Sequence, residues 1–347
     1  MNIRSPAFAG QVVRWQKRHG RHDLPWQHTR NPYRIWLAEV MLQQTQVATV
    51  IPYYRRFLRR FPNLKSLTQA PLDDVLTLWS GLGYYSRARH LHRAAQQIAV
   101  RHRGRFPRDF EAMLALPGIG RSTAAAICAF AFGERRAILD GNVKRLFARC
   151  FGVEGWPGAP RVEKKLWALA ESLLPRAGIA VYAQGLMDLG ATVCTRGKPR
   201  CGECPLRGRC MARRENRIAR LPTPRPRATL LRKRTQMLVL LRGGEVLLEK
   251  RALNGLWGGL WSLPEALPGD DIIALCRRRY GADIAPPLPL PPIAHGFTHF
   301  HLNIEPARCM VTRLIPAAAE PGTLWLPVED ALGAAIPAPV RRILGAL

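Results

Sequence analysis

Two carboxylates with unlike neighbours are the side chains of this sequence best suited to acid–base chemistry. Glu39 stands beside Trp36 and Leu42 in an apolar helical stretch, and Asp140 precedes Asn142 at an expected helix start. Apolar surroundings raise the pKa of a carboxyl group, whereas polar neighbours keep it ionised. We therefore expect Glu39 to act as a general acid and Asp140 to stabilise positive charge or activate water. Taken singly, Glu39 could be an exposed helical residue and Asp140 a helix N-cap.

Four cysteines form the clearest candidate metal site. Cys194, Cys201, Cys204 and Cys210 are spaced C-x6-C-x2-C-x5-C. Zinc usually prefers paired C-x2-C hooks, and the single C-x2-C with longer flanking gaps fits a cubane iron–sulfur cluster at least as well. Spacing alone favours iron–sulfur and leaves zinc open. Five cations fill the gaps between the cysteines and predict a structural loop that contacts phosphates: Arg196, Lys198, Arg200, Arg207 and Arg209.

A glycine-rich turn at Leu116–Gly120 separates two helical patterns. Gly118 and Gly120 allow backbone N–H groups to point outward, and the N-terminus of the next helix adds partial positive charge. Such a turn suits a phosphate oxygen. A simple connection between two helices is the alternative.

The elements that position these residues are helical in the first two-thirds of the chain. Phe8, Val12 and Trp15 recur at i, i+4 and i+7, and a longer apolar stripe begins at Tyr85. Further helices are expected over 109–116, 121–132, 142–151, 161–174 and 180–190. The pattern predicts an all-α domain over residues 1–217.

After residue 217 the helical pattern ends, and the sequence predicts a linker followed by a second domain. Prolines and arginines predict a semi-rigid basic linker over 218–232. Two apolar runs, 237–241 and 246–248, flank Gly243-Gly244 and predict a hairpin. A helix at 270–280 and a short strand around 300–305 complete an expected α+β domain over 233–347.

Net charge points to a polyanionic partner. The 347 residues carry a formal charge of +29, and residues 1–220 hold +24 of it, against +5 for residues 221–347. Nucleic acid is the expected partner, although the excess of arginine over lysine can also reflect composition alone. Because no apolar run reaches a membrane span and the N-terminus lacks a signal peptide pattern, we expect a cytoplasmic, nucleoid-associated protein without a membrane partner.

Taken together, these motifs resemble one superfamily. A helix–hairpin–helix followed, twenty residues after Gly120, by Asp140 is similar to the DNA glycosylases that include endonuclease III, and the cysteine loop resembles their iron–sulfur subset. The resemblance implies a [4Fe-4S] cluster. Lyase members carry a lysine where this chain has Ser122, and a hydroxyl cannot form a Schiff base. A monofunctional glycosylase is therefore implied, with Ser122 and Asn142 counted among its catalytic residues.

Five segments narrow the resemblance to the adenine DNA glycosylase (MutY) family: 24–26, 36–46, 81–89, 138–145 and 184–190. This family removes adenine mispaired with 8-oxoguanine or guanine in double-stranded DNA, which implies that Glu39 protonates adenine N7 and Asp140 supports the sugar cation. The base must be flipped out of the duplex. The residues implied to contact DNA or base are Arg21, Trp26, Gln43, Gln44, Thr45, Tyr84, Gly118, Gly120 and Gln184, with Gln44 and Tyr84 as wedges in the base stack.

The C-terminal part resembles a MutT-like domain. Gly259 and Glu265 fit the start of a nucleotide hydrolase box, but Arg277 and Arg278 stand where its paired glutamates belong. Arginine cannot bind Mg²⁺, so the domain is expected to be inactive as a hydrolase. Phe297, Thr298 and His299 match the family loop that contacts 8-oxoguanine, with threonine in place of the usual serine.

The sequence therefore predicts a multi-domain, monomeric protein. Its all-α helix–hairpin–helix glycosylase domain carries an iron–sulfur loop, and an α+β MutT-like domain follows. A thymine- or uracil-mismatch glycosylase is the nearest alternative, although it usually lacks the appended domain and the Glu39 context. A non-catalytic iron–sulfur DNA-binding protein is the alternative from another class.

Overall fold

The computed structural model describes residues 5–226, 229–315 and 322–347. The first residues of the predicted N-terminal domain, residues 227–228 of the predicted linker and residues 316–321 of the predicted C-terminal domain lie outside this range. No described helix is both long and apolar enough to cross a membrane.

By their internal contacts the residues form two compact units. Unit 1 comprises residues 1–69 and 90–227, and unit 2 comprises residues 70–89 and 228–347. The sequence prediction placed residues 70–89 in the N-terminal domain, whereas their contacts group them with the C-terminal residues. Arg89, for example, donates a hydrogen bond from Nη1 to the carbonyl oxygen of Gly258 at 2.6 Å.

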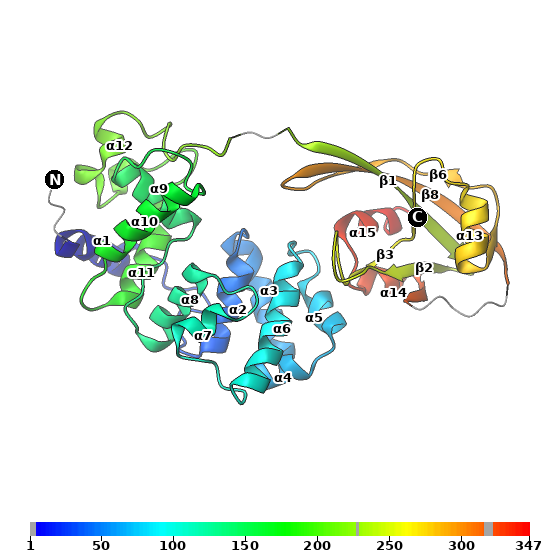
Figure 1. Ribbon diagram of the computed structural model, residues 1–347, viewed down its shortest axis with the longest axis horizontal. Coiled ribbons are helices and arrows are strands. Elements are labelled where there is room, and N and C mark those ends of the chain that lie inside the picture. Colours follow the sequence, from blue (N-terminus) through cyan, green and yellow to red (C-terminus); the bar gives the residue numbers. More distant parts are fainter. Residues whose placement is uncertain (1–4, 227–228, 316–321) are drawn as a thin grey trace. The chain divides into compact units, whose positions relative to one another are not determined.

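Unit 1 is built from helices and loops, as predicted (Figure 1). Its α-helices are α1 (Ser5–His19), α2 (Pro32–Leu42), α3 (Val47–Arg60), α4 (Leu64–Gln69), α6 (Ser86–Arg101, whose first turn belongs to unit 2), α7 (Phe110–Leu114), α8 (Arg121–Ile127), α9 (Gly141–Cys150), α10 (Pro160–Ser172), α11 (Ile179–Asp188) and α12 (Met211–Arg214). Two π-helical turns, Cys128–Phe132 and Leu189–Val193, extend α8 and α11. Apolar periodicity predicted the helices but not the change to π-helical winding.

A hydrophobic core holds α1, α9 and α11 together. Phe8 and Val12 of α1 are fully buried, as their spacing predicted, and pack in one cluster with Phe147 of α9 and Leu186 of α11. Burying each such side chain contributes about 1.5–3 kcal/mol. Figure 1 shows α1 and α11 side by side. This core fixes the first residue of α9 and the inner face of α11, where several of the predicted site residues lie.

Helix α2 is buried on most of its circumference. Asn31 caps its N-terminus, since the side-chain oxygen accepts from the backbone N–H of Tyr33 at 3.0 Å, and Pro32 begins the first turn. Trp36, Leu37 and Ala38 are almost inaccessible to solvent. A carboxylate on this helix therefore has apolar neighbours on both sides.

Unit 2 contains a mixed sheet with the order β3-β2-β1-β8-β5 along its main path. Its strands are β1 (Leu231–Arg242), β2 (Glu245–Lys250), β3 (Trp261–Ser262), β4 (Glu265–Ala266), β5 (Ala282–Ile284), β6 (Leu288–Pro289), β7 (Ile293–Gly296), β8 (Phe300–Leu314) and β9 (Thr323–Pro327). The predicted hairpin is confirmed, because β1 and β2 pair antiparallel across Gly243-Gly244, both at positive φ. Strand β8 is far longer than the expected 300–305, because its parallel pairing with β1 continues from Phe300 to Met310.

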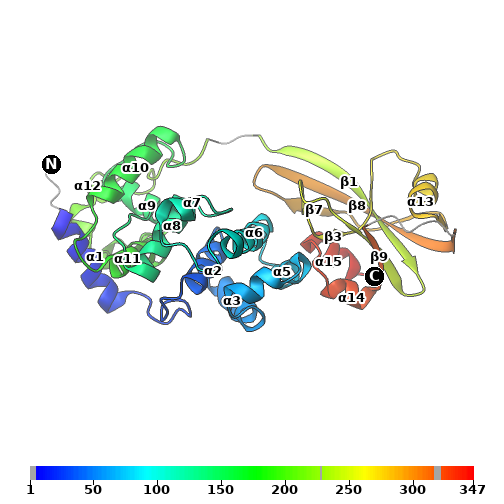
Figure 2. The same ribbon diagram turned by 60° about the horizontal axis from the view of Figure 1, so that its bottom comes forward.

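The helices that lie wholly within the described part of unit 2 are α5 (Leu72–Trp79), α13 (Ile272–Tyr280), α14 (Val328–Gly333) and α15 (Ala338–Leu344). Helix α13, predicted at 270–280, lies on one side of the sheet, and α14 and α15 lie on the other (Figures 1 and 2). Cys276 of α13 packs in one apolar cluster with Leu238 and Leu240 of β1. The predicted α+β domain is thus confirmed.

Candidate active site

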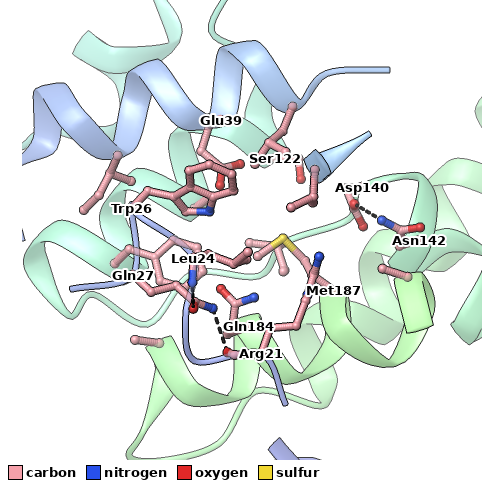
Figure 3. A pocket seen from close by; sticks show the side chains of 18 of the residues that line it. Arg21, Leu24, Trp26, Gln27, Glu39, Ser122, Asp140, Asn142, Gln184 and Met187 are labelled. Carbon is pink, nitrogen blue, oxygen red and sulfur yellow. Dashed lines mark hydrogen bonds between the residues drawn. The ribbon is translucent and has the colours of Figure 1, made fainter. Parts of the chain in front are cut away.

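A cavity of about 1530 Å³ opens in unit 1. It is formed by the loop before α2, the end of α2, the start of α8, the start of α9 and the inner face of α11. Ten of the residues predicted from the sequence line it: Arg21, Trp26, Glu39, Gln43, Gln44, Thr45, Ser122, Asp140, Asn142 and Gln184. Figure 3 labels Arg21, Trp26, Glu39, Ser122, Asp140, Asn142 and Gln184 among them. Residues separated by more than 160 positions in the chain are thereby brought to one site.

Glu39 points into this cavity from α2 and is otherwise surrounded by protein. Burial, followed by the negative charge of Asp140, raises the pKa of Glu39 to about 8. The side chain lines the cavity and is partly exposed, and it accepts no hydrogen bond from the part of the chain that the structure describes. Its proton is therefore retained at neutral pH, as a general acid requires.

Asp140 is the N-cap of α9. One carboxylate oxygen accepts from the backbone N–H of Val143 at 2.8 Å and the other from the side-chain amide of Asn142 at 3.1 Å. Burial raises the pKa of Asp140, and these two hydrogen bonds and the charge of Arg145 act in the opposite direction. These hydrogen bonds favour the charged form of Asp140, whereas no described residue donates one to Glu39, and this difference favours ionisation of Asp140 before Glu39. Asp140 therefore caps α9, as the alternative from the sequence stated, and it also lines the cavity.

Ser122 lies in the cavity wall at the start of α8. Its hydroxyl oxygen accepts from the backbone N–H of Leu139 at 3.1 Å and so fastens the residue before Asp140. Gln43 donates from Nε2 to the hydroxyl of Thr123 at 3.3 Å, which ties the end of α2 to α8. Both residues therefore hold the two acid-bearing elements against one another.

The predicted base-binding residues form another part of the cavity wall. Trp26 is 8% exposed, and its ring meets Tyr54 edge-on with centroids 5.4 Å apart. Arg21 and Gln184 are both joined to Asp188, a fully buried residue that sequence reasoning did not select. The i, i+4 spacing of Gln184 and Asp188 on one helix was the available signal.

The two predicted wedges share a backbone property. Gln44 has φ = 58° and Tyr84 has φ = 48°, a left-handed conformation that is uncommon outside glycine. Both side chains are exposed, Tyr84 by 45%. Strained backbone often marks functional positions. Gln44 belongs to unit 1 and Tyr84 to unit 2.

The two glycines of the hairpin differ in what they allow. Gly118 has φ = 77°, and a Cβ there would lie 2.8 Å from Cβ of His90, so the fold itself requires glycine. A Cβ on Gly120 would meet no described atom within 4 Å. The packing of the described residues therefore does not require glycine at position 120.

The cysteine loop forms a second site. Cys194, Cys201, Cys204 and Cys210 line one small cavity together with Leu206. No three of the described His, Cys, Asp or Glu side chains converge tightly enough for a single ion. In a cubane each thiolate binds its own iron, so the thiolates spread around a volume, and this donor set fits such a cluster.

Two arginines of α9 join this loop to the active site. Arg149, only 4% exposed, donates to the carbonyl oxygens of Thr195 at 2.7 Å and Leu221 at 2.8 Å. Arg145 donates to the carbonyl oxygen of Cys194 and to Oδ1 of Asn142, both at 2.8 Å. The loop thereby stabilises the helix that Asp140 caps. Two arginines of the loop also bind backbone oxygens: Arg207 donates to the carbonyl oxygen of Gly202 within the loop, and Arg200 donates to that of Thr192 just before it.

In unit 2, Thr298 and His299 form the tip of the β7–β8 hairpin, closed by a 2.8 Å hydrogen bond from the N–H of Phe297 to the carbonyl oxygen of Phe300. Both tip residues are exposed, and the Thr298 hydroxyl lies 3.2 Å from Nδ1 of His299. The backbone of this segment is a turn that connects the ends of two strands. Exposed polar side chains at such a tip are accessible to a partner.

Comparisons with known proteins agree with this arrangement. Residues 37–172 match the HhH-GPD superfamily of base excision DNA repair proteins, residues 194–210 match the iron–sulfur binding domain of endonuclease III, and residues 236–346 match the NUDIX domain. The adenine DNA glycosylase of Buchnera aphidicola subsp. Acyrthosiphon pisum is 36% identical over 97% of this chain and 96% of its own length. The human adenine DNA glycosylase is 32% identical over 97% of this chain and 73% of its own length.

This chain belongs to the adenine DNA glycosylase family. Among solved structures, a thermostable thymine-DNA glycosylase is similar, with a TM-score of 0.56 and 31% identity over 62% of this chain and 98% of that chain. A non-covalent endonuclease III–DNA complex shares the fold, with a TM-score of 0.52 and 21% identity over 60% of this chain and 95% of that chain. The match of the cysteine loop to an iron–sulfur binding domain confirms the predicted iron–sulfur cluster. Of the two metals that the cysteine spacing left open, the match favours iron–sulfur over zinc.

Membership in the adenine DNA glycosylase family does not by itself explain one close contact behind the site. A Cβ on Gly190 would lie 2.5 Å from Cβ of Asn142, and Arg145 donates to the Gly190 carbonyl oxygen at 2.7 Å. Gly190 lies inside a segment that resembled the family, but only the packing reveals its purpose. Glycine at this position lets the start of α9, with Asn142, pack closely against the π-helical turn that extends α11.

Gly190→Ala should therefore lower base release at least tenfold, because the added methyl group displaces Asn142 and weakens the hold on Asp140. Overpacking of this kind also costs about 1–3 kcal/mol of stability. The measurement is the single-turnover rate on the cognate duplex. Gly197→Ala is the matched control, since a Cβ there meets no described atom within 4 Å. Equal rates for the two variants would contradict this role of Gly190.

The pH dependence of base release should report the two acids. If Glu39 is the proton donor and Asp140 the carboxylate that stabilises positive charge, catalysis needs Glu39 protonated and Asp140 ionised. The single-turnover rate should then fall tenfold per pH unit above about pH 8, where Glu39 loses its proton. It should also fall at low pH as Asp140 becomes protonated. A rate that stays constant from pH 7 to pH 10 would exclude Glu39 as the proton donor.

Proposed function

We propose that this protein removes adenine mispaired with 8-oxoguanine, or with guanine, from double-stranded DNA and so initiates base excision repair. The observation that carries the proposal is the pair of unlike acids, Glu39 and Asp140, in a cavity large enough to hold a flipped base. We propose adenine as the base because the related proteins are adenine DNA glycosylases. We further propose that the protein acts as a monomer on DNA of the nucleoid.

Positive charge and the hairpin would hold the duplex. Lys17, Arg30 and Arg196 lie at the cavity with no acid ion-paired to them among the described residues, and cations so placed suit the phosphates that flank an extruded nucleotide. The open space at Gly120 allows the DNA backbone to approach the first turn of α8. Unstacking a base costs a few kcal/mol, and Gln44 and Tyr84 would fill the space that the base leaves.

The chemical step would proceed by proton transfer and bond cleavage. Glu39 gives its proton to N7 of adenine, the bond from N9 to the sugar C1′ breaks, and the bonding electrons leave with neutral adenine. The Asp140 carboxylate stabilises the oxocarbenium cation that remains. Water then adds its oxygen to C1′ and returns a proton to Glu39. Since Ser122 stands where lyases carry lysine, the product keeps an intact strand with an abasic site.

The iron–sulfur cluster would act as a structural staple, held by Cys194, Cys201, Cys204 and Cys210. When bound, it supplies four metal–thiolate bonds that order the loop. Through Arg145 and Arg149 the ordered loop supports α9 and therefore Asp140.

The C-terminal domain would recognise the oxidised guanine and would not hydrolyse nucleotides. Helix α13, at the place of the hydrolase box, has Arg277 and Arg278 and no carboxylate. Glu265, the remaining acid of the box, is paired with Arg251 at 3.0 Å. Thr298 and His299 at the hairpin tip are the side chains proposed to contact 8-oxoguanine.

Duplexes that contain 8-oxoguanine·A, G·T or G·U distinguish the candidate functions. After incubation and alkali treatment, only the first should be cut, at the adenine. Glu39→Gln should abolish the cut and retain duplex binding, since the amide cannot supply the proton, while Glu111→Gln on α7 should behave as wild type. Cutting at T or U would instead indicate a mismatch glycosylase, and binding without any cut would indicate a non-catalytic protein. Retained turnover by Glu39→Gln would remove Glu39 from the mechanism.

The lesion-recognition role of the hairpin tip predicts a loss of discrimination. Thr298→Ala with His299→Ala should lower the preference for 8-oxoguanine·A over G·A by about tenfold, because each lost hydrogen bond is worth about 0.5–1.5 kcal/mol. The readout is the ratio of single-turnover rates on the two duplexes. An unchanged ratio would show that this tip does not select the oxidised base.

A further inference from the structure

We infer that Asp188 determines which base the cavity accepts, by fixing the end of the Gln184 side-chain amide that faces the base. This inference rests on the proposed function. Asp188 does not line the cavity and touches no substrate, so its role is that of a positioning residue. Three contacts, one chemical asymmetry and one close approach support it.

Asp188 ends α11 and is completely buried behind the cavity wall. Its Oδ1 accepts from Nε2 of Gln184 at 2.9 Å and from Nε of Arg21 at 2.7 Å. Its Oδ2 accepts from the backbone N–H of Arg21 at 3.0 Å. The guanidinium of Arg21 also neutralises the carboxylate, which makes a buried charge tolerable at this position. One residue therefore holds two groups of the cavity wall from behind.

A carboxylate has only acceptors, and this asymmetry orients the amide. Gln184 must direct its NH₂ group to Asp188, because the opposite orientation would oppose two oxygen acceptors in a buried place. The Oε1 atom is then the end left for the cavity, and it accepts no hydrogen bond from the described residues. Figure 3 shows the Gln184 amide beside Met187 within the cavity lining.

An acceptor at this position selects for a base that presents a donor. Adenine carries an exocyclic amino group at C6, whereas hypoxanthine and guanine carry a carbonyl oxygen there. A carbonyl opposite Oε1 leaves two buried acceptors without a proton between them, which is penalised more than the loss of one hydrogen bond. A purine without a substituent at C6 would lose the hydrogen bond but meet no repulsion.

The chain approaches Asp188 closely at one further place. A Cβ on Gly20 would lie 3.0 Å from Oδ2 of Asp188 and 2.6 Å from the carbonyl oxygen of Gln16. Glycine at position 20 therefore permits the contact through which the N–H of Arg21 reaches Asp188. The loop that carries Arg21 is placed against α11 by the same carboxylate that orients Gln184.

The test uses the full chain and three duplexes, with 8-oxoguanine opposite adenine, hypoxanthine or unsubstituted purine. Asp188→Asn offers Gln184 both a donor and an acceptor, so the amide is no longer held in one orientation. We expect the ratio of single-turnover rates for adenine over hypoxanthine to fall about tenfold. The ratio of hypoxanthine to unsubstituted purine should rise, because the repulsion is relieved. A purely structural role of Asp188 would lower all three rates by a common factor and leave both ratios unchanged, which would overturn the inference.

Two further variants make every outcome decisive. Glu163→Gln removes the ion pair of Glu163 with Lys144, 2.7 Å apart, without touching Arg21 or Gln184, and should leave both ratios at their wild-type values. Gln184→Met keeps the length of the side chain but has no amide, and should lose the preference for adenine over hypoxanthine even if Asp188→Asn fails to fold. A wild-type ratio in Gln184→Met would overturn the inference. A wild-type protein that releases no adenine would instead overturn the proposed function.

Discussion

Two carboxyl groups, Glu39 and Asp140, line one cavity of this protein, and the proposed chemistry requires them to hold different protonation states there. Water would ionise both groups, and an unrelieved apolar site would neutralise both. The separation arises because hydrogen bonds are given to one group only. Asp140 accepts from Val143 and Asn142, whereas Glu39 has burial and the repulsion of Asp140 acting on it.

The helices can be understood as supports for this difference. Helix α2 is buried around most of its circumference, which gives Glu39 apolar neighbours on both sides. Asp140 caps the N-terminus of helix α9. Gly190 leaves room for Asn142 in the first turn of this helix. Arg145 and Arg149 attach the helix to the cysteine loop. A metal-stapled loop far from the acids in sequence thus contributes to their chemistry by holding one helix.

The parts of the site that depend on local pattern and residue type could be predicted from the sequence. Glu39 in an apolar helix, Asp140 before a helix and four closely spaced cysteines each have a local signature, and the structure places the two acids in one cavity and the cysteines in another. Asp188 and Gly190 have no such signature, because their importance arises from contacts with Arg21 and Asn142, which lie 167 and 48 positions away. The length of β8 was underestimated for the same reason, since pairing with β1 is a non-local property. The grouping of residues 70–89 with the C-terminal unit likewise depends on long-range contacts that periodicity does not express.

We propose that Glu39 retains its proton at neutral pH because it is buried beside an ionised Asp140. Carbon-13 NMR of protein labelled at glutamate side-chain carboxyls measures this directly, with Glu39→Gln to assign the signal and Asp140→Asn to test the coupling. We predict one carboxyl that titrates near pH 8, is absent from Glu39→Gln and shifts to lower pH in Asp140→Asn. If every glutamate signal titrates below about pH 6, or if the signal near pH 8 persists in Glu39→Gln, Glu39 is not protonated at neutral pH and cannot be the proton donor proposed here.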